Sequence, residues 1–204
     1  MHEFFAIALA HFIAVASPGP DFLIVLRHAT NSGSRTAIVT SLGIACGIAI
    51  HCILAITGLS LIISNNPALR SWIQVLGCAY LIYLGITAVR SKTGHTKYKN
   101  PPPIASSAGA FFQGFTVNLL NVKATLFFIA LFSGLISNNT LLSTKLVYGA
   151  YLSIATFIWF AIVATLLTTP APRRFFDKFE PQLNKSFGMI IMLLGILGIL
   201  EVYF

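Results

Sequence analysis

The chain has 204 residues, of which 56% are hydrophobic and 9% are charged, and its formal net charge is +8 at pH 7. Soluble globular domains carry about 25% charged residues because their surfaces need them. Together with a mean hydropathy of +0.85, this composition excludes a soluble enzyme, a disordered chain and a disulfide-stapled secreted module, and it indicates an all-α, polytopic membrane protein.

Six apolar runs are long enough to cross a bilayer, which takes about 20 mostly apolar residues per helix. They predict transmembrane helices over residues of about 4–26, 38–63, 69–89, 109–136, 145–168 and 186–203. The first run is interpreted as an uncleaved span rather than a signal peptide, because no Lys or Arg precedes it. Residues 1–204 are therefore expected to form a single transmembrane domain.

Basic residues are distributed unevenly among the connections between these helices. Ten follow the first, third and fifth helices and two follow the second and fourth: Arg27, Arg35, Arg90, Lys92, Lys97, Lys99, Arg173, Arg174, Lys178 and Lys185, against Arg70 and Lys145. The positive-inside rule then places both termini outside the cytoplasm. Basic residues spaced between apolar runs are typical of membrane topology, so no nucleic-acid partner is expected.

A basic cytoplasmic linker over residues 90–107 separates two sets of three helices. Because three is odd, the second set enters the membrane inverted with respect to the first. Inverted repeats are a common transporter plan, with the binding site at the interface of the halves. The sequence therefore predicts a 3+3 inverted repeat, although direct similarity between the halves is weak.

The segment Pro18-Gly19-Pro20 should interrupt the first helix, because proline removes a backbone donor and clashes with the preceding turn. Freed backbone groups in a membrane must face protein or a water-filled cavity. The segment is interpreted as part of a solute site, with a packing kink as the alternative. The adjacent Asp21 favours the site, since an intramembrane acid needs a partner, a proton or water. Pairing of Asp21 with Arg27 or His28 remains open.

Lys123 is the second charge within a predicted span, near the middle of the fourth helix. Asn118 and Asn121 precede it: Asn118 lies about one helical turn from Lys123, whereas Asn121 would face elsewhere unless the helix is distorted. A purely structural salt bridge between Lys123 and Asp21 is the alternative to a binding role. Either interpretation joins the two halves of the chain.

In the second helix, Gly43, Gly47 and His51 repeat every four residues and share a face. The glycines predict close helix packing and could also serve a homo-oligomer. His51 is either a buried core residue or a proton or substrate ligand, because histidine titrates near neutral pH. Tyr80 in the third helix is a candidate cavity hydroxyl, with packing as its alternative.

These residues resemble the LysE/RhtB family of bacterial amino-acid exporters. The resemblance rests on four stretches in order: Ser17-Pro18-Gly19-Pro20-Asp21, Gly43-x3-Gly47-x3-His51, Gly77-x2-Tyr80-Leu81-x2-Leu84-Gly85 and Gly114-Phe115-x2-Asn118-x2-Asn121-Val122-Lys123. The family usually has Asn-Pro-Lys where this chain has Asn121-Val122-Lys123, so a break in the fourth helix is not assured.

The resemblance implies proton-driven export of small amino acids or derivatives, such as threonine, homoserine or homoserine lactone, across the bacterial cytoplasmic (inner) membrane. An amino acid is a zwitterion, and its site must neutralise one charge of each sign. We expect Asp21 to bind the ammonium and to exchange protons, with His51 as a second proton-coupling candidate. We expect Lys123 to bind the carboxylate with Asn118, Asn121 and the amides of the broken helix around Pro18, Gly19 and Pro20.

Other classes of function fit less well. An enzyme would need a nucleophile–base set or a metal motif, and none appears. An inorganic cation or metal exporter of the same architecture is the alternative, but it would need clustered His, Asp or Cys side chains in the spans. No cofactor and no metal are expected.

Overall fold

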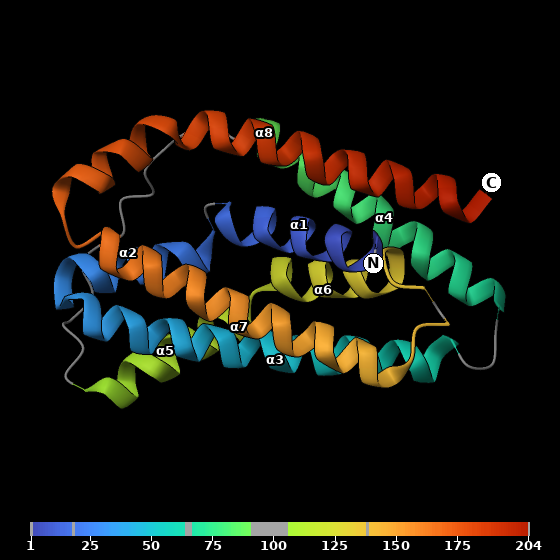
Figure 1. The fold of residues 1–204 in the computed structure, drawn as a ribbon, viewed down its shortest axis with the longest axis horizontal. Coiled ribbons are helices and arrows are strands. Elements are labelled where there is room, and N and C mark those ends of the chain that lie inside the picture. Colours follow the sequence, from blue (N-terminus) through green and yellow to red (C-terminus); the bar gives the residue numbers. More distant parts are fainter. Residues whose placement is uncertain (1, 18, 64–66, 91–105, 138, 204) are drawn as a thin grey trace.

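The computed structural model describes residues 2–17, 19–63, 67–90, 106–137 and 139–203, which form eight helices and no strand (Figure 1). The all-α prediction is confirmed for this part of the chain. The helices are α1 (His2–Ala16), α2 (Pro20–Ser32), α3 (Ser34–Ile63), α4 (Pro67–Arg90), α5 (Ser107–Leu119), α6 (Val122–Gly134), α7 (Leu142–Leu166) and α8 (Pro170–Tyr203). Most of the predicted basic linker lies outside the described residues.

Two of the predicted spans are broken helices. The first is interrupted after Ala16 and resumes as α2 at Pro20, with a bend of 53° between the two parts. Pro20 occupies the first turn of α2, where its missing N–H leaves no hydrogen bond unmade. The predicted continuous helix over 109–136 is also divided, because α5 ends at Leu119 and α6 begins at Val122 with a bend of 59°.

Three helical segments in the described part are long and apolar enough to cross a membrane, namely Ser34–Gly58, Ser71–Arg90 and Leu142–Leu166; they become five if each broken pair is one span. The predicted sixth span lies in α8, which begins at Pro170, well before residue 186. Its charged first part lowers the hydropathy without preventing a helix, and its apolar part is Asn184–Leu200.

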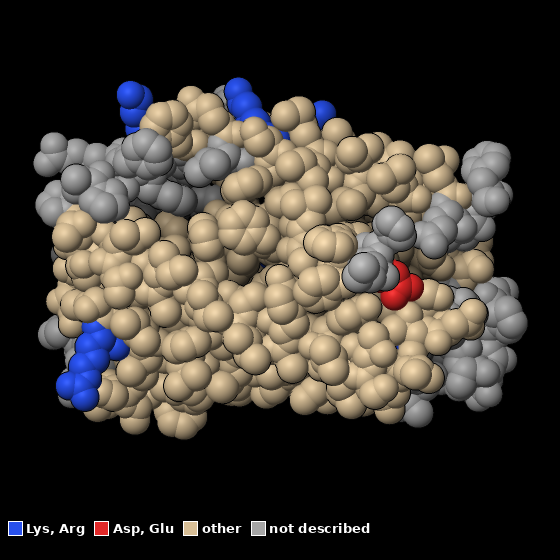
Figure 2. Space-filling model, viewed as in Figure 1, with Lys and Arg blue, Asp and Glu red and all other residues tan. Residues whose placement is uncertain are grey.

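The helices lie along the long axis of the molecule (Figure 1). The pair α4 and α8 packs on one side, and α3 packs with α5 and α7 on the other, with α1 and α6 between them. The broken helices run in opposite directions, since α1 and α2 run toward the end from which α5 and α6 start. On the face in Figure 2, the acidic atoms of the described residues lie near the start of α1, and most of the described surface is uncharged.

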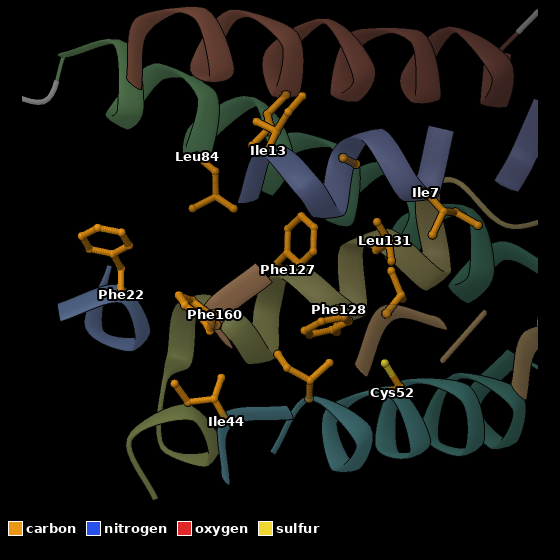
Figure 3. Packing of buried hydrophobic residues seen from close by; sticks show 14 of the residues in the cluster. Ile7, Ile13, Phe22, Ile44, Cys52, Leu84, Phe127, Phe128, Leu131 and Phe160 are labelled. Carbon is orange, nitrogen blue, oxygen red and sulfur yellow. The ribbon is translucent and has the colours of Figure 1, made fainter. Parts of the chain in front are cut away.

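The core is built around α6, where Phe127 and Phe128 are 4% and 2% exposed and pack among Ile13 of α1, Ile44 of α3 and Phe160 of α7 (Figure 3). Large apolar side chains also point outward, as at Leu76, Leu146, Ile154, Ile158 and Leu193. Because lipid tails are as apolar as these side chains, close packing rather than burial from water must hold such helices together.

Glycines make this close packing possible. A methyl group at Gly43 of α3 would overlap the carbonyl oxygen of Phe111 on α5, and one at Gly114 of α5 would overlap the carbonyl oxygen of Thr40 on α3. At the α4–α8 contact, a methyl group at Gly85 would lie 2.5 Å from the carbonyl oxygen of Gly188. The Gly43 face is therefore covered by α5 of the same chain and does not offer a surface to a second copy.

The contact at Gly43 generates a stability prediction. Gly43→Ala should destabilise the protein by about 1–3 kcal/mol, because the backbone of α5 must move to admit the methyl group. Gly58→Ala on the same helix is the matched control, since nothing lies within 4 Å of its added methyl group. Thermal unfolding in detergent or nanodiscs measures both. Equal melting temperatures for the two variants would contradict the close α3–α5 contact.

Candidate functional site

Asp21 lies in the first turn of α2, directly after the first helix break. Its carboxylate is there favoured by the positive end of the helix dipole. Oδ2 accepts a hydrogen bond of 2.9 Å from the side-chain amide of Asn118, whereas Oδ1 is buried and has no partner among the described residues. His28 is engaged elsewhere, with Thr40 and with Gln113 at 3.2 Å. The predicted alternative of an Asp21–His28 pair is therefore not observed.

Asn118 joins this acid to a second break. It is fully buried at the end of α5, and its carbonyl oxygen accepts a hydrogen bond of 3.1 Å from Nε2 of His51 on α3. A carbonyl only accepts, so Nε2 of His51 carries the proton. The His51 ring also stacks on Phe128 at 6.1 Å between centroids. His51 thus contacts Asp21 through Asn118 rather than directly.

Gly47 gives Asn118 the room it needs. A methyl group at Gly47 would overlap Oδ1 of Asn118 and lie 3.1 Å from its Cβ and Cγ. The spacing of Gly47 and His51, one turn apart on α3, therefore places one residue beside the side chain of Asn118 and the other beside its carbonyl. The predicted glycine–histidine face is the surface that holds this asparagine.

The second break exists without proline. Asn121 is the N-cap of α6, and its Oδ1 accepts hydrogen bonds from the backbone N–H groups of Lys123 at 3.1 Å and Ala124 at 3.4 Å. This cap satisfies two of the backbone donors that a helix start leaves free. It also places Lys123 in the first turn of α6, where the helix dipole disfavours a cation. A nearby anion would offset that cost.

A cavity of about 60 Å³ lies between the two breaks. Its polar wall contains Ser17, Gly19, Pro20, Asp21, Asn121 and Lys123, and its remaining wall contains His11, Ala14, Val15, Phe22, Ile48, Ala124, Phe127, Phe128 and Phe160. Asp21 and Lys123 both line this cavity. The structure therefore brings together an acid, a base and two helix starts against a wall that is mostly apolar.

The other predicted site residues lie around this cavity or beside it. Asn118 and His51 do not line the cavity: Asn118 bonds Asp21, and His51 bonds Asn118. Pro18 lies outside the described residues. Tyr80 does not line the Asp21 cavity, but lines a second cavity that also contains Ser17 and Lys123. Three Cys, His, Asp or Glu side chains do not gather anywhere in the described part of the chain as metal ligands would.

Sequence reasoning missed several cavity residues. His11 is buried, and its Nε2 lies 2.9 Å from the hydroxyl of Thr156 on α7. A histidine within a predicted span is a signal that could have found it, as it did His51. Phe127, Phe128 and Phe160 gave no such signal, because an aromatic residue in an apolar run looks the same whether it faces lipid or a cavity.

A protein-family model for the LysE type translocator matches residues 12–201. The chain belongs to the LysE type translocator family. The translocator is 31% identical over 196 residues to a threonine efflux protein of Escherichia coli K12, covering 95% of each chain. It is 31% identical to the threonine efflux protein of Salmonella typhimurium, covering 96% of this chain and 97% of that one.

A homoserine/homoserine lactone efflux protein of Salmonella typhimurium is 29% identical over 194 residues, covering 95% of the translocator and 94% of the relative. No solved structure matches the chain. Val122, which stands where the resemblance led us to expect proline, is the first residue of α6. Proline is well tolerated at that position of a helix, so either residue is compatible with the same break.

The Asn121 cap generates a second prediction. Asn121→Ala should lower stability by about 1 kcal/mol, because two N–H groups at the start of α6 lose their acceptor. Asn121→Ser keeps a capping oxygen and should lose much less. Unfolding of both variants in detergent measures the difference. If alanine and serine were equally well tolerated, the break in this translocator would not depend on its cap.

Proposed function

We propose that the chain is a secondary active exporter of small neutral amino acids, of the threonine and homoserine type, coupled to protons by antiport. The observation that carries this proposal is the cavity that holds one acid and one base at two helix breaks. The relatives named for threonine efflux and for homoserine and homoserine lactone efflux support the substrate class. They favour it over an inorganic cation.

The cavity walls would offer each charged end of an amino acid a group of opposite charge. The substrate ammonium would bind Oδ1 of Asp21, the carboxylate oxygen that lacks a partner among the described residues. The substrate carboxylate would bind Lys123 and offset the cost of a cation in the first turn of α6. The walls of this cavity of about 60 Å³, which include Ile48 and Phe160, would have to move apart to admit an amino acid and would favour a small side chain.

Asn118 and His51 act in this scheme as positioning residues. The amide of Asn118 is bonded to Asp21, so it orients the acid instead of binding the substrate carboxylate. His51 holds the backbone of Asn118. Asn121 supports Lys123 by capping the helix that carries it. Gly19 and Pro20 form the start of α2 against the cavity.

Proton coupling follows from competition for one carboxylate. A proton arriving from outside would displace the ammonium from Asp21 and release the amino acid there. The protonated carrier would return to the inward-facing state, release the proton into the cytoplasm and accept a new ammonium. Because only one of the two cations can neutralise Asp21 at a time, the two fluxes have opposite directions.

The helix order supports six spans in a 3+3 arrangement. Each half contains a broken helix followed by two long helices, α1/α2–α3–α4 and α5/α6–α7–α8. Equivalent helices pack on one another, α3 on α7 and α4 on α8, as expected around a two-fold axis. The two termini lie toward the same end of the molecule (Figure 1), and the positive-inside rule would place that end outside the cytoplasm. The membrane would be the bacterial inner membrane.

The role of Asp21 is tested by Asp21→Asn in proteoliposomes with an imposed pH gradient. Gradient-driven transport of L-threonine should fall by about 10- to 100-fold, as expected for loss of one charge-assisted hydrogen bond worth about 1.5–3 kcal/mol. Asp177→Asn is the control, because Asp177 is the only other aspartate of the sequence and lies outside the candidate spans. Unchanged gradient-driven transport by Asp21→Asn would eliminate Asp21 as the coupling residue.

The role of Lys123 is tested with two ligands that differ in the carboxylate. Lys123→Gln should weaken competition by L-threonine in counterflow by about tenfold or more. Homoserine lactone has an ammonium but no free carboxylate, so its competition should change little. Lys178→Gln, on an exposed part of α8, is the control. Equal losses for both ligands would remove Lys123 from the carboxylate subsite.

A further inference from the structure

A second cavity, of about 480 Å³, adjoins the Asp21 cavity and shares Ser17 and Lys123 with it. Its other walls come from three helices: Tyr80, Tyr83, Leu84, Thr87 and Ala88 of α4, Val122 and Leu126 of α6, and Asn184 of α8. Lys123 therefore lies at the boundary of two spaces. A ligand in the larger one could reach its ammonium without first reaching Asp21.

The second cavity extends toward the basic end of the molecule. Its wall on α4 runs from Tyr80 to Ala88, a length of about 12 Å along the helix axis. That wall ends two residues before Arg90, and Asn184 on α8 directly precedes Lys185. The positive-inside rule assigns this end to the cytoplasm. The larger cavity thus reaches from Lys123 toward the proposed cytoplasmic side.

The opposite end is held together by contacts of α1. The Glu3 carboxylate accepts hydrogen bonds of 3.0 Å from the backbone N–H of Ser137 and from the hydroxyl of Thr140. Beside it, the ring of Phe4 lies 5.9 Å from that of Tyr148 and 4.9 Å from that of Tyr151 on α7. These contacts join α1 to α7 and to the α6–α7 connection at the end away from Arg90 and Lys185.

A polar contact lies at the boundary of the two cavities, where Ser17 lines both of them. Ser17, just after the end of α1, donates a hydrogen bond to Oδ1 of Asn184, which is buried on α8. Its length of 3.5 Å is beyond the usual range for hydroxyl donors, so the bond is weak. Because Ser17 lines both cavities and lies at a helix break, movement of this end of α1 would change the boundary between them.

The lining chemistry indicates the ligand. The described wall contains the hydroxyls of Tyr80, Tyr83 and Thr87, the amide of Asn184 and one cation, Lys123, and it contains no acid. Such a cavity attracts a carboxylate and offers hydrogen bonds to a small polar molecule. It does not offer an anion to a substrate ammonium. The larger cavity therefore suits the carboxylate end of an amino acid.

We propose that the second cavity is a cytoplasmic entry subsite, where an amino acid binds through its carboxylate to Lys123 before its ammonium reaches Asp21. This inference rests on the proposed function and adds a second place of binding to it. The amino acid would pass the Ser17–Asn184 contact while Lys123 keeps hold of its carboxylate, so the cation serves both subsites.

Thiol labelling tests the subsite without relying on transport. Thr87→Cys and Ile86→Cys are made in a chain whose Cys46, Cys52 and Cys78 are replaced by alanine. The two positions lie at the same depth, but Thr87 lines the cavity and Ile86 does not. Inside-out membrane vesicles are treated with a charged, membrane-impermeant methanethiosulfonate, with and without L-threonine. Leu84→Cys, one turn deeper in the cavity, repeats the measurement if Thr87→Cys does not fold.

Thr87→Cys should react about tenfold faster than Ile86→Cys, because thiolate formation needs water, and L-threonine should slow it several-fold. Equal rates for the two positions would overturn the cavity as an aqueous entrance, even in a chain that transports threonine. Fast labelling that L-threonine does not slow, in a variant that still transports it, would overturn the subsite and leave the proposed function intact. No protection together with no transport would overturn both.

Discussion

The hydrogen bond between Asn118 and Asp21 is the interaction on which the site depends. A carboxylate inside an apolar helix bundle is costly unless something binds it. Its donor here comes from the other half of the chain, at the end of α5, while Asp21 itself stands at the start of α2. One bond therefore fixes the two helix breaks relative to each other. The cavity between the breaks follows from that arrangement.

Close backbone packing between α3 and α5 holds Asn118 in the position from which it bonds Asp21. Asn118 fits only because Gly47 has no side chain, and α5 approaches α3 only because Gly43 and Gly114 have none. In a bilayer such contacts carry much of the association between helices, since lipid already satisfies apolar side chains. The same α3–α5 contact that stabilises the fold thus determines where the amide of the site lies.

The helical class, the first break and several polar residues near Asp21, namely Asn118, Asn121 and Lys123, could be predicted from the sequence. Prolines and intramembrane charges are rare enough in apolar spans to be informative singly. The second break was harder to foresee, because Val122 looks like any other apolar residue. Its cause is the side chain of Asn121, whose capping role depends on a local backbone conformation that composition does not reveal. Tyr80 was predicted only as a candidate cavity hydroxyl, and the cavity that it lines could not be predicted, since spacing along α4 does not show which side of Lys123 a hydroxyl faces.

The cap at Asn121 determines which substitutions near the second helix break the fold can tolerate. A break made by proline comes from its missing backbone N–H and its fixed ring, so it persists whatever its neighbours are. A break made by an asparagine is held by two hydrogen bonds, so it can weaken or strengthen with single substitutions at one position. The break then does not require proline at position 122, so that position can vary. It does require a capping side chain at position 121, so substitutions there are expected to be less well tolerated. Two lineages could therefore keep the same helix geometry while exchanging the residue that enforces it.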